Sequence, residues 1–348
     1  MLILNILKSS IRNGAENVVI QTIQGIKYID PMYNAIYVSM DGAIKNDIAN
    51  EEIVSEFIQK LDCKEIRRLV KKYRPDIIHA HGYTASVLCA LSMVKVPIIS
   101  HLHGNPPWIR QVNFRTLLYG LSSKRFKCII GVSEEVLSEN TFYNIFKTKA
   151  LVQSNPINID KIRKLASDGE ITEQYDIAFV GAFREAKNPI GFIKIISAVD
   201  AIKPVKAVMI GSGPQWERVV EEIKRYDLRE HIKLTGKVSN PYGYIKNSKI
   251  MCAPRKWEGY GLAIAEALAL GKPIVASPVG GIPYLLSNGG GVLCETTNDY
   301  VNVINKLLTD SEFYIKLSES ALLNAQQMCT IEEYCQKIIS VYNHVVEN

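Results

Sequence analysis

The 348-residue chain is longer than one hydrophobic core usually supports, so two domains are expected. With 47% apolar and 22% charged residues and a net charge of +6, it is a folded globular protein, not a disordered chain or a strongly basic nucleic-acid binder. Its seven cysteines include no CxxC pair, which favours buried thiols of a reducing cytoplasm over disulfides or a zinc site. We expect no signal peptide, and no apolar run approaches the ~18 residues of a membrane span.

Short apolar runs alternate with longer helical patterns along the whole chain, which is typical of parallel sheets built from βαβ units. The first series of strands is predicted at residues 2–7, 35–39, 77–80, 98–101, 128–132 and 151–153. The second series is predicted at residues 176–180, 206–210, 231–235, 250–253, 273–276 and 291–293. Between them, residues 156–172 are polar and contain proline, and we interpret them as a linker without a core element.

The predicted fold class is therefore α/β, with two Rossmann-like, doubly wound parallel sheets in tandem. We assign residues 1–158 to the first domain and 159–331 to the second. A C-terminal helix at about 332–348 is expected to pack back on the first domain. Ligands of such sheets bind at the carboxyl ends of the strands, so we expect the site in a cleft between the two domains.

Three glycine loops are candidates for phosphate binding. Gly14 precedes an amphipathic helix, Gly211 and Gly213 follow a strand directly, and "EGYGLAIAEAL" opens an apolar helix. Glycine permits close approach of the backbone, and the first amides of a helix are unsatisfied donors. A tight turn explains each glycine equally well. A dinucleotide fingerprint is disfavoured, because Trp216 replaces the third glycine of G-x-G-x-x-G.

Four of the six histidines form two matching pairs, in "DIIHAHG" and "PIISHLHG". Residues i and i+2 of a strand share a face, so His79 with His81, or His101 with His103, could chelate a metal. No further ligand set has a recognisable spacing, so we favour core or turn positions for His79 and His101. His81 and His103, each followed by glycine, are expected to emerge at the strand ends.

Two cations, Arg184 and Lys187, follow the first strand of the second series. At a spacing of three residues they share one helical face and could bind one diphosphate, although two solvated surface charges would look the same. Further along, Glu266 lies within a helix that is otherwise apolar all round. A buried carboxylate needs a partner, so we expect Glu266 to face a polar ligand.

These motifs resemble glycosyltransferase family 4 over essentially the whole chain. "EGYGLAIAEALALGKPIVASPVGGIPYLL" matches the E-x7-E block with its tail, and "GAFREAKN" matches R-x-x-K. "DIIHAHG", "ISHLHG", "IGSGP" and "NGAE" are similar too. The resemblance implies a GT-B fold, with an acceptor-side first domain and a nucleotide-sugar-binding second domain.

The resemblance also implies residue roles. Arg184 and Lys187 would hold the donor's diphosphate, Glu258 the donor sugar, and Glu266 the ribose. His103 would lie near the sugar carbon or the acceptor, and Lys237 and Val238 near the base. Further donor contacts are implied for Gly14, Gly211, Gly213, Gly259, Tyr260, Gly261 and Leu262. The glycine loop departs from the family pattern, because Asn13 stands where a second glycine is common.

The implied activity is a metal-independent, retaining hexosyltransferase reaction without any cofactor. The donor would be a nucleotide sugar, with UDP as the expected nucleotide, and the acceptor a glycan or lipid-linked molecule of bacterial surface polysaccharide or glycolipid synthesis. The chain has no D-x-D sequence, the metal-diphosphate motif of the other large glycosyltransferase fold. Two alternatives remain: a nucleotide-sugar epimerase or hydrolase on the same scaffold, and a catalytically silent nucleotide-sugar-binding protein.

Charge gives the clue to further partners. Residues 1–160 hold 19 Lys and Arg against 14 Asp and Glu, concentrated in "KEIRRLVKKYRPD" and "WIRQVNFRTLLYGLSSKRFK". These segments could attract an anionic membrane surface, or could be solvated helix faces. We expect a cytoplasmic protein, peripheral on the inner face of the cell membrane if the first alternative holds, and no nucleic-acid partner.

Overall fold

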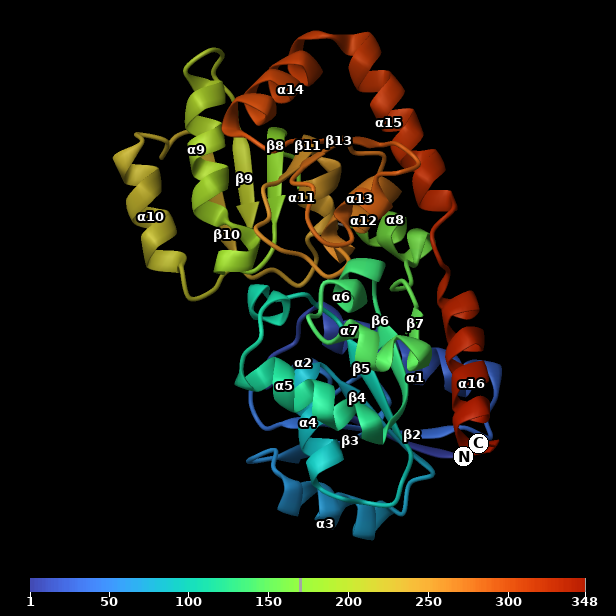
Figure 1. Cartoon of the computed structure of the whole chain (residues 1–348). Coiled ribbons are helices and arrows are strands. Elements are labelled where there is room, and N and C mark those ends of the chain that lie inside the picture. Colours follow the sequence, from blue (N-terminus) through green and yellow to red (C-terminus); the bar gives the residue numbers. More distant parts are fainter. Residues whose placement is uncertain (169–170, 348) are drawn as a thin grey trace. The chain divides into compact units, whose positions relative to one another are not determined.

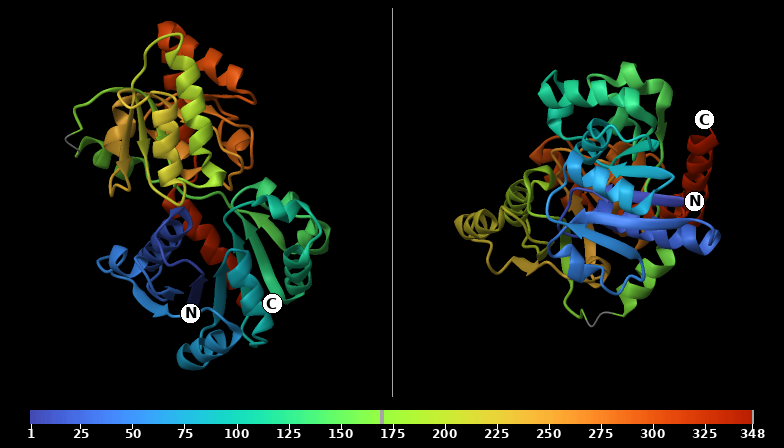
Figure 2. Two further views of the ribbon diagram at one scale, coloured as in Figure 1. Left: turned by 90° about the vertical axis from the view of Figure 1, so that its left-hand side faces the viewer. Right: turned by 90° about the horizontal axis from the view of Figure 1, so that it is seen from below.

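The computed structural model describes residues 1–168 and 171–347. The chain divides into two compact units, one formed by Met1–Pro156 with Cys329–Asn348 and the other by Ile157–Met328 (Figure 1). Each unit contains one parallel sheet with helices on both faces (Figure 2). No helix of the described residues is long and apolar enough to cross a membrane.

The first unit contains a seven-stranded sheet in the order β3-β2-β1-β4-β5-β6-β7, in which all neighbouring strands are parallel. The strand order changes direction at β1, next to β4, and such switch points place ligands at the carboxyl ends of the strands. The strands are β1 Leu2–Leu7, β2 Asn34–Met40, β3 Val54–Ile58, β4 Ile77–His81, β5 Ile98–Leu102, β6 Phe126–Gly131 and β7 Ala150–Val152.

Helices cover both faces of this first sheet. The last helix, α16 (Ile331–Glu347), packs against α1 (Gly14–Ile29), although the two are far apart in the sequence (Figure 1). Gly25 allows the close approach, because a Cβ there would lie 2.6 Å from Cys335 Sγ. The remaining helical segments are α2 Ile44–Asp47, α3 Cys63–Tyr73, α4 Tyr83–Leu91, η1 Pro107–Arg110, α5 Phe114–Ser122, η2 Ser123–Arg125, α6 Glu134–Ser138, α7 Tyr143–Phe146 and η3 Lys147–Lys149.

Strand β3 was not predicted from the sequence. It lies at the edge of the sheet, and its first two residues, Val54 and Ser55, are exposed. Glu56 points toward α3, where it accepts hydrogen bonds from Arg68 and Lys72. An edge strand with one buried residue lacks the apolar run that indicates the central strands of a parallel sheet.

The second unit contains a six-stranded parallel sheet in the order β10-β9-β8-β11-β12-β13. Each of its six strands overlaps one predicted from the sequence, because most of these strands contain a short apolar run. The strands are β8 Tyr175–Val180, β9 Ala207–Ile210, β10 Ile232–Gly236, β11 Ser248–Ala253, β12 Ile274–Ala276 and β13 Gly291–Leu293.

Two groups of helices pack on this second sheet. The helix α9 contacts α10 and α14, whereas α12 contacts α8, α11 and α15 (Figure 1). The core beneath the first group contains Phe179, Phe192 and Met209, all fully buried. The helical segments are α8 Ile159–Ser167, η4 Glu185–Lys187, α9 Pro189–Asp200, α10 Trp216–Arg225, α11 Tyr242–Lys246, α12 Leu262–Ala269, α13 Ile282–Leu285, α14 Thr297–Thr309 and α15 Ser311–Gln326.

The prediction of a linker without a core element at residues 156–172 was wrong for most of that stretch. Asn158 caps α8 by accepting a hydrogen bond from the Lys161 amide at 2.9 Å. Ile162 and Ala166, four residues apart, form the buried stripe of this short helix. Two buried residues in nine make a weak sequence signal. Residues 169 and 170 lie outside the described part of the chain.

Candidate active site

Three loops of the second unit meet at the carboxyl ends of neighbouring strands. They follow β8, β9 and β11, which lie side by side in the sheet. The Phe183 amide donates to Ser212 O at 2.9 Å and joins the first two loops. The Lys256 amide donates to Ala186 O at 2.9 Å and joins the first loop to the third. The sheet order therefore brings Arg184, Lys187 and Glu258 to one edge.

Gly211 and Gly213 allow the loops after β8 and β9 to touch. A Cβ on Gly211 would lie 2.1 Å from Gly181 O, and a Cβ on Gly213 would lie 2.8 Å from Phe183 O. Real Cβ atoms do not come so close to backbone atoms, so no side chain fits at either position. Loop packing thus accounts for both glycines, and their contact with a donor stays a prediction.

A charged cluster forms the centre of these loops. Lys187 Nζ donates a hydrogen bond to Glu258 Oε2. The Nε of Arg255 lies 3.8 Å from the same oxygen. The Gly259 amide donates to Glu258 Oε1 at 3.2 Å. Two cations therefore share one carboxylate, so the cluster carries a formal charge of +1 and favours an anion.

Burial and charge act against one another in this cluster. Burial raises the pKa of Glu258, but Lys187 and Arg255 outweigh it and lower that pKa below its ordinary value. Burial also lowers the pKa of Lys187, although its attraction to Glu258 opposes the change. Glu258 is therefore ionised at neutral pH. The carboxylate is held by its two cations and the Gly259 amide.

Arg255 was not among the residues singled out in the sequence. Its side chain is buried, its Nη2 donates to Val180 O at 2.6 Å, and its guanidinium lies over the Phe179 ring. Nε and Nη1 of Arg255 have no hydrogen-bond partner among the described residues. The sequence feature that could have identified Arg255 is its position three residues before Glu258, in the loop that carries the first glutamate of the E-x7-E motif.

Arg184 directly precedes the 3-10 turn η4 and has extended backbone angles, and Lys187 is the last residue of that turn. The expectation that both residues lie on one helix was therefore wrong, although both belong to the loop after β8. The Arg184 side chain is exposed and makes no hydrogen bond or ion pair within the described residues. It differs in this from Lys187, which is half-buried and paired with Glu258.

Helix α12 carries Glu266 on its less buried face. The helix begins after Gly261, whose φ of 101° places it in the left-handed region that favours glycine. Leu262, Ala263 and Glu266 are only partly buried, so the expectation of a helix that is apolar and buried all round was wrong on this face. Tyr242 Oη donates to Glu266 Oε1 at 3.1 Å. Burial raises the pKa of Glu266 to about 7.

The other predicted donor contacts are divided between the two units, with Gly14 in the first and the rest in the second. Tyr260 is buried, and the Gly259 amide is already bonded to Glu258. Lys237 and Val238 directly follow β10, with Lys237 exposed and Val238 half-buried. In the first unit, Gly14 begins α1, and the preceding amide of Asn13 donates to Glu16 Oε2 at 2.9 Å. A phosphate at that amide would therefore compete with Glu16.

Four histidines lie on one face of the first sheet, at the ends of β4 and β5. His79 Nε2 lies 3.2 Å from His101 Nδ1, and His81 Nδ1 lies 3.0 Å from His103 Nε2. Burial lowers the pKa of all four, to about 3 for His79 and about 4 for His103, so they are neutral at pH 7. The expectation that His81 emerges at the strand end was wrong, because its side chain is buried beside Asn5.

The orientation of Asn5 sets the tautomers of one pair. Asn5 Oδ1 can only accept, so His81 Nε2, 3.2 Å away, carries the proton. His81 Nδ1 then accepts from His103 Nε2, which leaves the Nδ1 of His103 as an acceptor. That atom is buried and has no hydrogen-bond partner in the described part of the chain. His103 itself is half-buried, unlike His79, His81 and His101.

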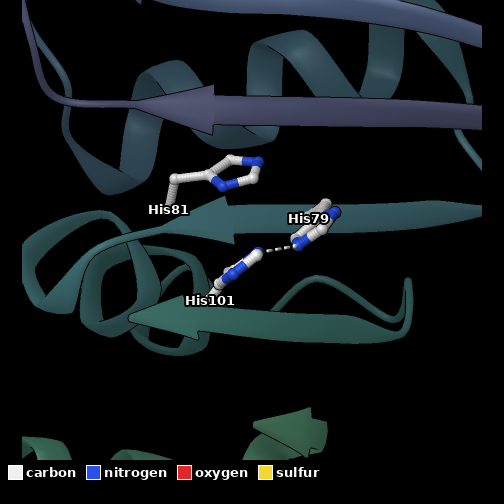
Figure 3. Close-up of side chains that lie close together, drawn as sticks. All are labelled: His79, His81 and His101. Atoms are coloured by element: carbon white, nitrogen blue, oxygen red, sulfur yellow. Dashed lines mark hydrogen bonds between the residues drawn. The ribbon is translucent and has the colours of Figure 1, made fainter. Parts of the chain in front are cut away.

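His79, His81 and His101 each offer one ring nitrogen within 4.8 Å of the others, so they could hold a metal ion (Figure 3). The nitrogens that face each other between His79 and His101 are, however, already hydrogen-bonded. The other nitrogen of His79 pairs with the Tyr342 hydroxyl at 2.8 Å. Metal-bound histidines commonly donate to a carboxylate or a backbone carbonyl, and among the described residues these rings bond to neither, since His81 bonds to the side-chain amide of Asn5. The arrangement favours a neutral hydrogen-bonded cluster.

Comparison with known families identifies the chain. The model of the glycosyl transferases group 1 matches residues 160–323, and the model of glycosyltransferase family 4 matches residues 59–161. Together they cover most of the chain and both units. The chain belongs to the family 4 glycosyltransferases.

This glycosyltransferase has curated relatives along most of its length. It is 23% identical over 310 residues to N-acetyl-alpha-D-glucosaminyl L-malate synthase of Bacillus anthracis, covering 82% of this chain and 79% of the relative. It is 24% identical over 306 residues to UDP-Gal:alpha-D-GlcNAc-diphosphoundecaprenol alpha-1,3-galactosyltransferase of Escherichia coli, covering 81% and 78%. Both relatives are sugar-handling enzymes by name.

Solved structures establish the fold of this glycosyltransferase. The structure of Anabaena Alr3699/HepE in complex with UDP-glucose matches with a TM-score of 0.85 and 20% identity, covering 99% of this chain and 100% of that one. WaaG, a glycosyltransferase involved in lipopolysaccharide biosynthesis, matches with a TM-score of 0.76 and 11% identity, covering 98% and 99%. The fold is GT-B, with two parallel-strand sheets and helices on both faces of each.

Proposed function

We propose that this glycosyltransferase transfers a sugar from a UDP-sugar to a glycan or lipid-linked acceptor with retention of configuration. The observation that carries the proposal is the charged cluster at the ends of β8 and β11, where Lys187 and Arg255 share Glu258. Its formal charge of +1 suits a diphosphate. The Escherichia coli relative, a galactosyltransferase named for UDP-Gal, and the Anabaena structure in complex with UDP-glucose support UDP as the nucleotide.

The proposed donor contacts follow the order of groups in a nucleotide sugar. Arg184 and Lys187 bind the diphosphate, and Glu258 binds hydroxyls of the sugar. Glu266 accepts hydrogen bonds from the ribose hydroxyls, since it lies four residues, or about 6 Å of helix, beyond the start of α12. Lys237 and Val238 contact the base, and Gly14, Gly211, Gly213 and the Gly259–Leu262 segment line the phosphate and sugar.

The proposed reaction needs no nucleophile from the protein. The bond between the anomeric carbon and the diphosphate oxygen breaks, and the acceptor hydroxyl oxygen bonds to the same face of that carbon. The acceptor proton passes to the departing phosphate oxygen. Arg184 and Lys187 stabilise the charge that grows on that oxygen, the kind of preorganised electrostatic work that dominates many enzymes. His103, neutral at pH 7, serves as a hydrogen-bonding group near the sugar or acceptor.

We propose that catalysis is independent of metal ions and of any cofactor. Two cations already lie at the site, and the chain contains no D-x-D sequence. Arg184 contributes an exposed guanidinium with no carboxylate partner among the described residues. It can therefore bind a phosphate group of the diphosphate through two parallel N–H···O hydrogen bonds.

For the acceptor side we propose a membrane surface at α5 and not at α3. On α3, Arg68 and Lys72 already pair with Glu56. The segment around α5 instead exposes large apolar residues, with exposed fractions of 74% for Val112 and 78% for Phe114.

Phe114, Leu117 and Leu121 are exposed and share one side of α5. Arg115 and Lys124 flank them and pair with no carboxylate among the described residues. Exposed apolar residues with adjacent bases suit the interface of an anionic bilayer. Flotation with phosphatidylglycerol vesicles should carry the wild type but not a Phe114→Ser/Leu117→Ser double variant. Equal flotation of both proteins would contradict membrane binding through α5.

Slow hydrolysis of the donor tests the central proposal. The protein is incubated with a panel of nucleotide sugars, and release of nucleoside diphosphate is measured. Release from a UDP-sugar that is lost in Lys187→Ala and Glu258→Ala, and that becomes faster when a glycan or lipid-linked acceptor is added, supports a transferase. Tight binding with no turnover of any donor would instead favour a silent nucleotide-sugar-binding protein. Release of an epimerised sugar, or of free sugar at a rate that none of the acceptors changes, would favour the epimerase or hydrolase alternative.

A further inference from the structure

The ion pair between Lys187 and Glu258 raises a problem for the proposed function. Lys187 must bind the donor's diphosphate, yet its Nζ is already hydrogen-bonded to Glu258 Oε2. If Lys187 turns away, Glu258 loses one of its two cations, and a carboxylate in a low-dielectric site is costly without a charged partner. A second group must therefore stabilise Glu258 in the donor-bound state.

Arg255 has the free hydrogen-bonding capacity for this task. Its Nε lies 3.8 Å from Glu258 Oε2, beyond hydrogen-bond distance. Nε and Nη1 are buried donors without a partner in the described part of the chain, a rare condition for buried polar groups. Nη2 is fixed on Val180 O at 2.6 Å, so the guanidinium is held in place at the end of β8.

The loop after β8 is shaped around both cations. A Cβ on Gly181 would lie 2.8 Å from Arg255 Nη1 and 3.4 Å from Lys187 Cγ. The absence of a side chain at this position leaves room for both basic groups beside one carboxylate. The guanidinium also packs over the Phe179 ring, with 5.3 Å between Arg255 Cζ and the ring centroid.

We propose that Arg255 acts as a positioning residue. It donates a hydrogen bond to the Glu258 carboxylate when Lys187 leaves that carboxylate and binds the donor's diphosphate. The inference rests on the proposed function. A movement of Glu258 by about 1 Å would bring the 3.8 Å separation from Arg255 Nε to the usual length of a charge-assisted hydrogen bond. Glu258 then stays ionised and oriented toward the donor sugar while Lys187 serves the phosphate.

Binding of UDP measured by calorimetry tests this exchange. UDP lacks the sugar that Glu258 is proposed to bind, so Glu258→Gln removes no contact to the probe and releases Lys187. We expect Glu258→Gln to bind UDP at least as tightly as the wild type. Arg255→Gln should bind UDP about tenfold more weakly or worse, because Lys187 stays on Glu258. The Arg255→Gln/Glu258→Gln double variant should recover the affinity of Glu258→Gln.

The recovery in the double variant separates the exchange from a merely structural role, which would give additive losses. Lys256→Gln is the matched control, since Lys256 is an exposed neighbour that pairs with Glu185 outside the cluster. If Arg255→Gln does not fold, Arg255→Lys replaces it. We expect Arg255→Lys to bind UDP a few-fold more weakly than the wild type, and the added Glu258→Gln substitution to restore the affinity.

Two outcomes would overturn the inference while the proposed function stands. One is a wild type and an Arg255→Gln variant that bind UDP equally well. The other is a double variant that binds as weakly as Arg255→Gln. A wild-type protein that binds neither UDP nor inorganic pyrophosphate would overturn the proposed function and this inference together.

Discussion

Each of the two units buries a polar cluster at the carboxyl edge of a parallel sheet. The two clusters differ in charge and in how their hydrogen-bonding groups are paired. In the first unit, His79, His81, His101 and His103 are neutral and hydrogen-bond mainly to one another. In the second, Lys187, Glu258 and Arg255 are charged, with a formal charge of +1, and two guanidinium nitrogens have no hydrogen-bond partner among the residues that the structure describes.

The difference indicates what each cluster can do. A neutral cluster of imidazoles stabilises the sheet edge and can offer a hydrogen-bond acceptor to a hydroxyl group. A charged cluster with an excess cation is built for an anion, because buried charge without a partner is costly. Hence we expect activity to depend on the charged cluster and stability to depend on the neutral one.

Lys187→Ala should have the largest effect. It removes a cation from the departing phosphate, so turnover of the UDP-sugar should fall by about 10² to 10³, the loss typical of removing one group that stabilises transition-state charge. Lys194→Ala is the control, because Lys194 is exposed on α9. Turnover is measured by release of UDP. An equal, small change in both variants would contradict a phosphate contact for Lys187.

Glu266 should make stability and binding depend on pH in opposite directions. Burial raises its pKa to about 7 in the folded protein, whereas an unfolded glutamate titrates near 4.5. The folded state therefore binds more protons between these values, and stability falls as pH rises through that window.

Glu266→Gln removes this titration, so its stability relative to the wild type should grow from pH 5 to pH 8 by on the order of 2 kcal/mol. Urea unfolding at several pH values measures the difference. UDP affinity of the wild type should rise over the same range, as the carboxylate that accepts the ribose hydroxyls forms. A difference in unfolding free energy that does not change with pH would show that the pKa of Glu266 is not raised in the folded protein.

Tyr342→Phe should act on the neutral cluster alone. Tyr342 Oη lies 2.8 Å from His79 Nδ1, and the substitution leaves that buried nitrogen without a partner. The expected loss is about 1 to 3 kcal/mol of unfolding free energy, with turnover of the donor nearly unchanged. Tyr284→Phe, at an exposed tyrosine, serves as the control. A variant as stable as the wild type would contradict a stabilising role for the histidine cluster.

Removal of metal ions should have the smallest effect. Dialysis against EDTA is expected to leave both turnover and unfolding free energy unchanged. Basic side chains bind the diphosphate in the proposed reaction, and the histidines hydrogen-bond to one another. A loss of turnover restored by Mn²⁺ would contradict metal-independent catalysis. A loss of stability restored by Zn²⁺ would instead assign a metal to His79, His81 and His101.

The central strands of both sheets were predictable, because buried parallel strands are short apolar runs that local sequence displays. The edge strand β3 and the helix α8 were not, since each buries only one or two residues. The candidate site followed from motifs at strand ends, where sheet order brings Lys187 and Glu258 together across 71 residues. Arg255 was missed because burial of a charge depends on tertiary packing, and no local pattern reports it.

A crystal structure of the protein with UDP would test the account most directly. We predict that the diphosphate lies against Arg184 and Lys187, that Glu258 has moved onto Arg255, and that Glu266 accepts hydrogen bonds from both ribose hydroxyls. Glu266 still bonded to Tyr242 and remote from the nucleotide, with Lys187 still on Glu258, would contradict it.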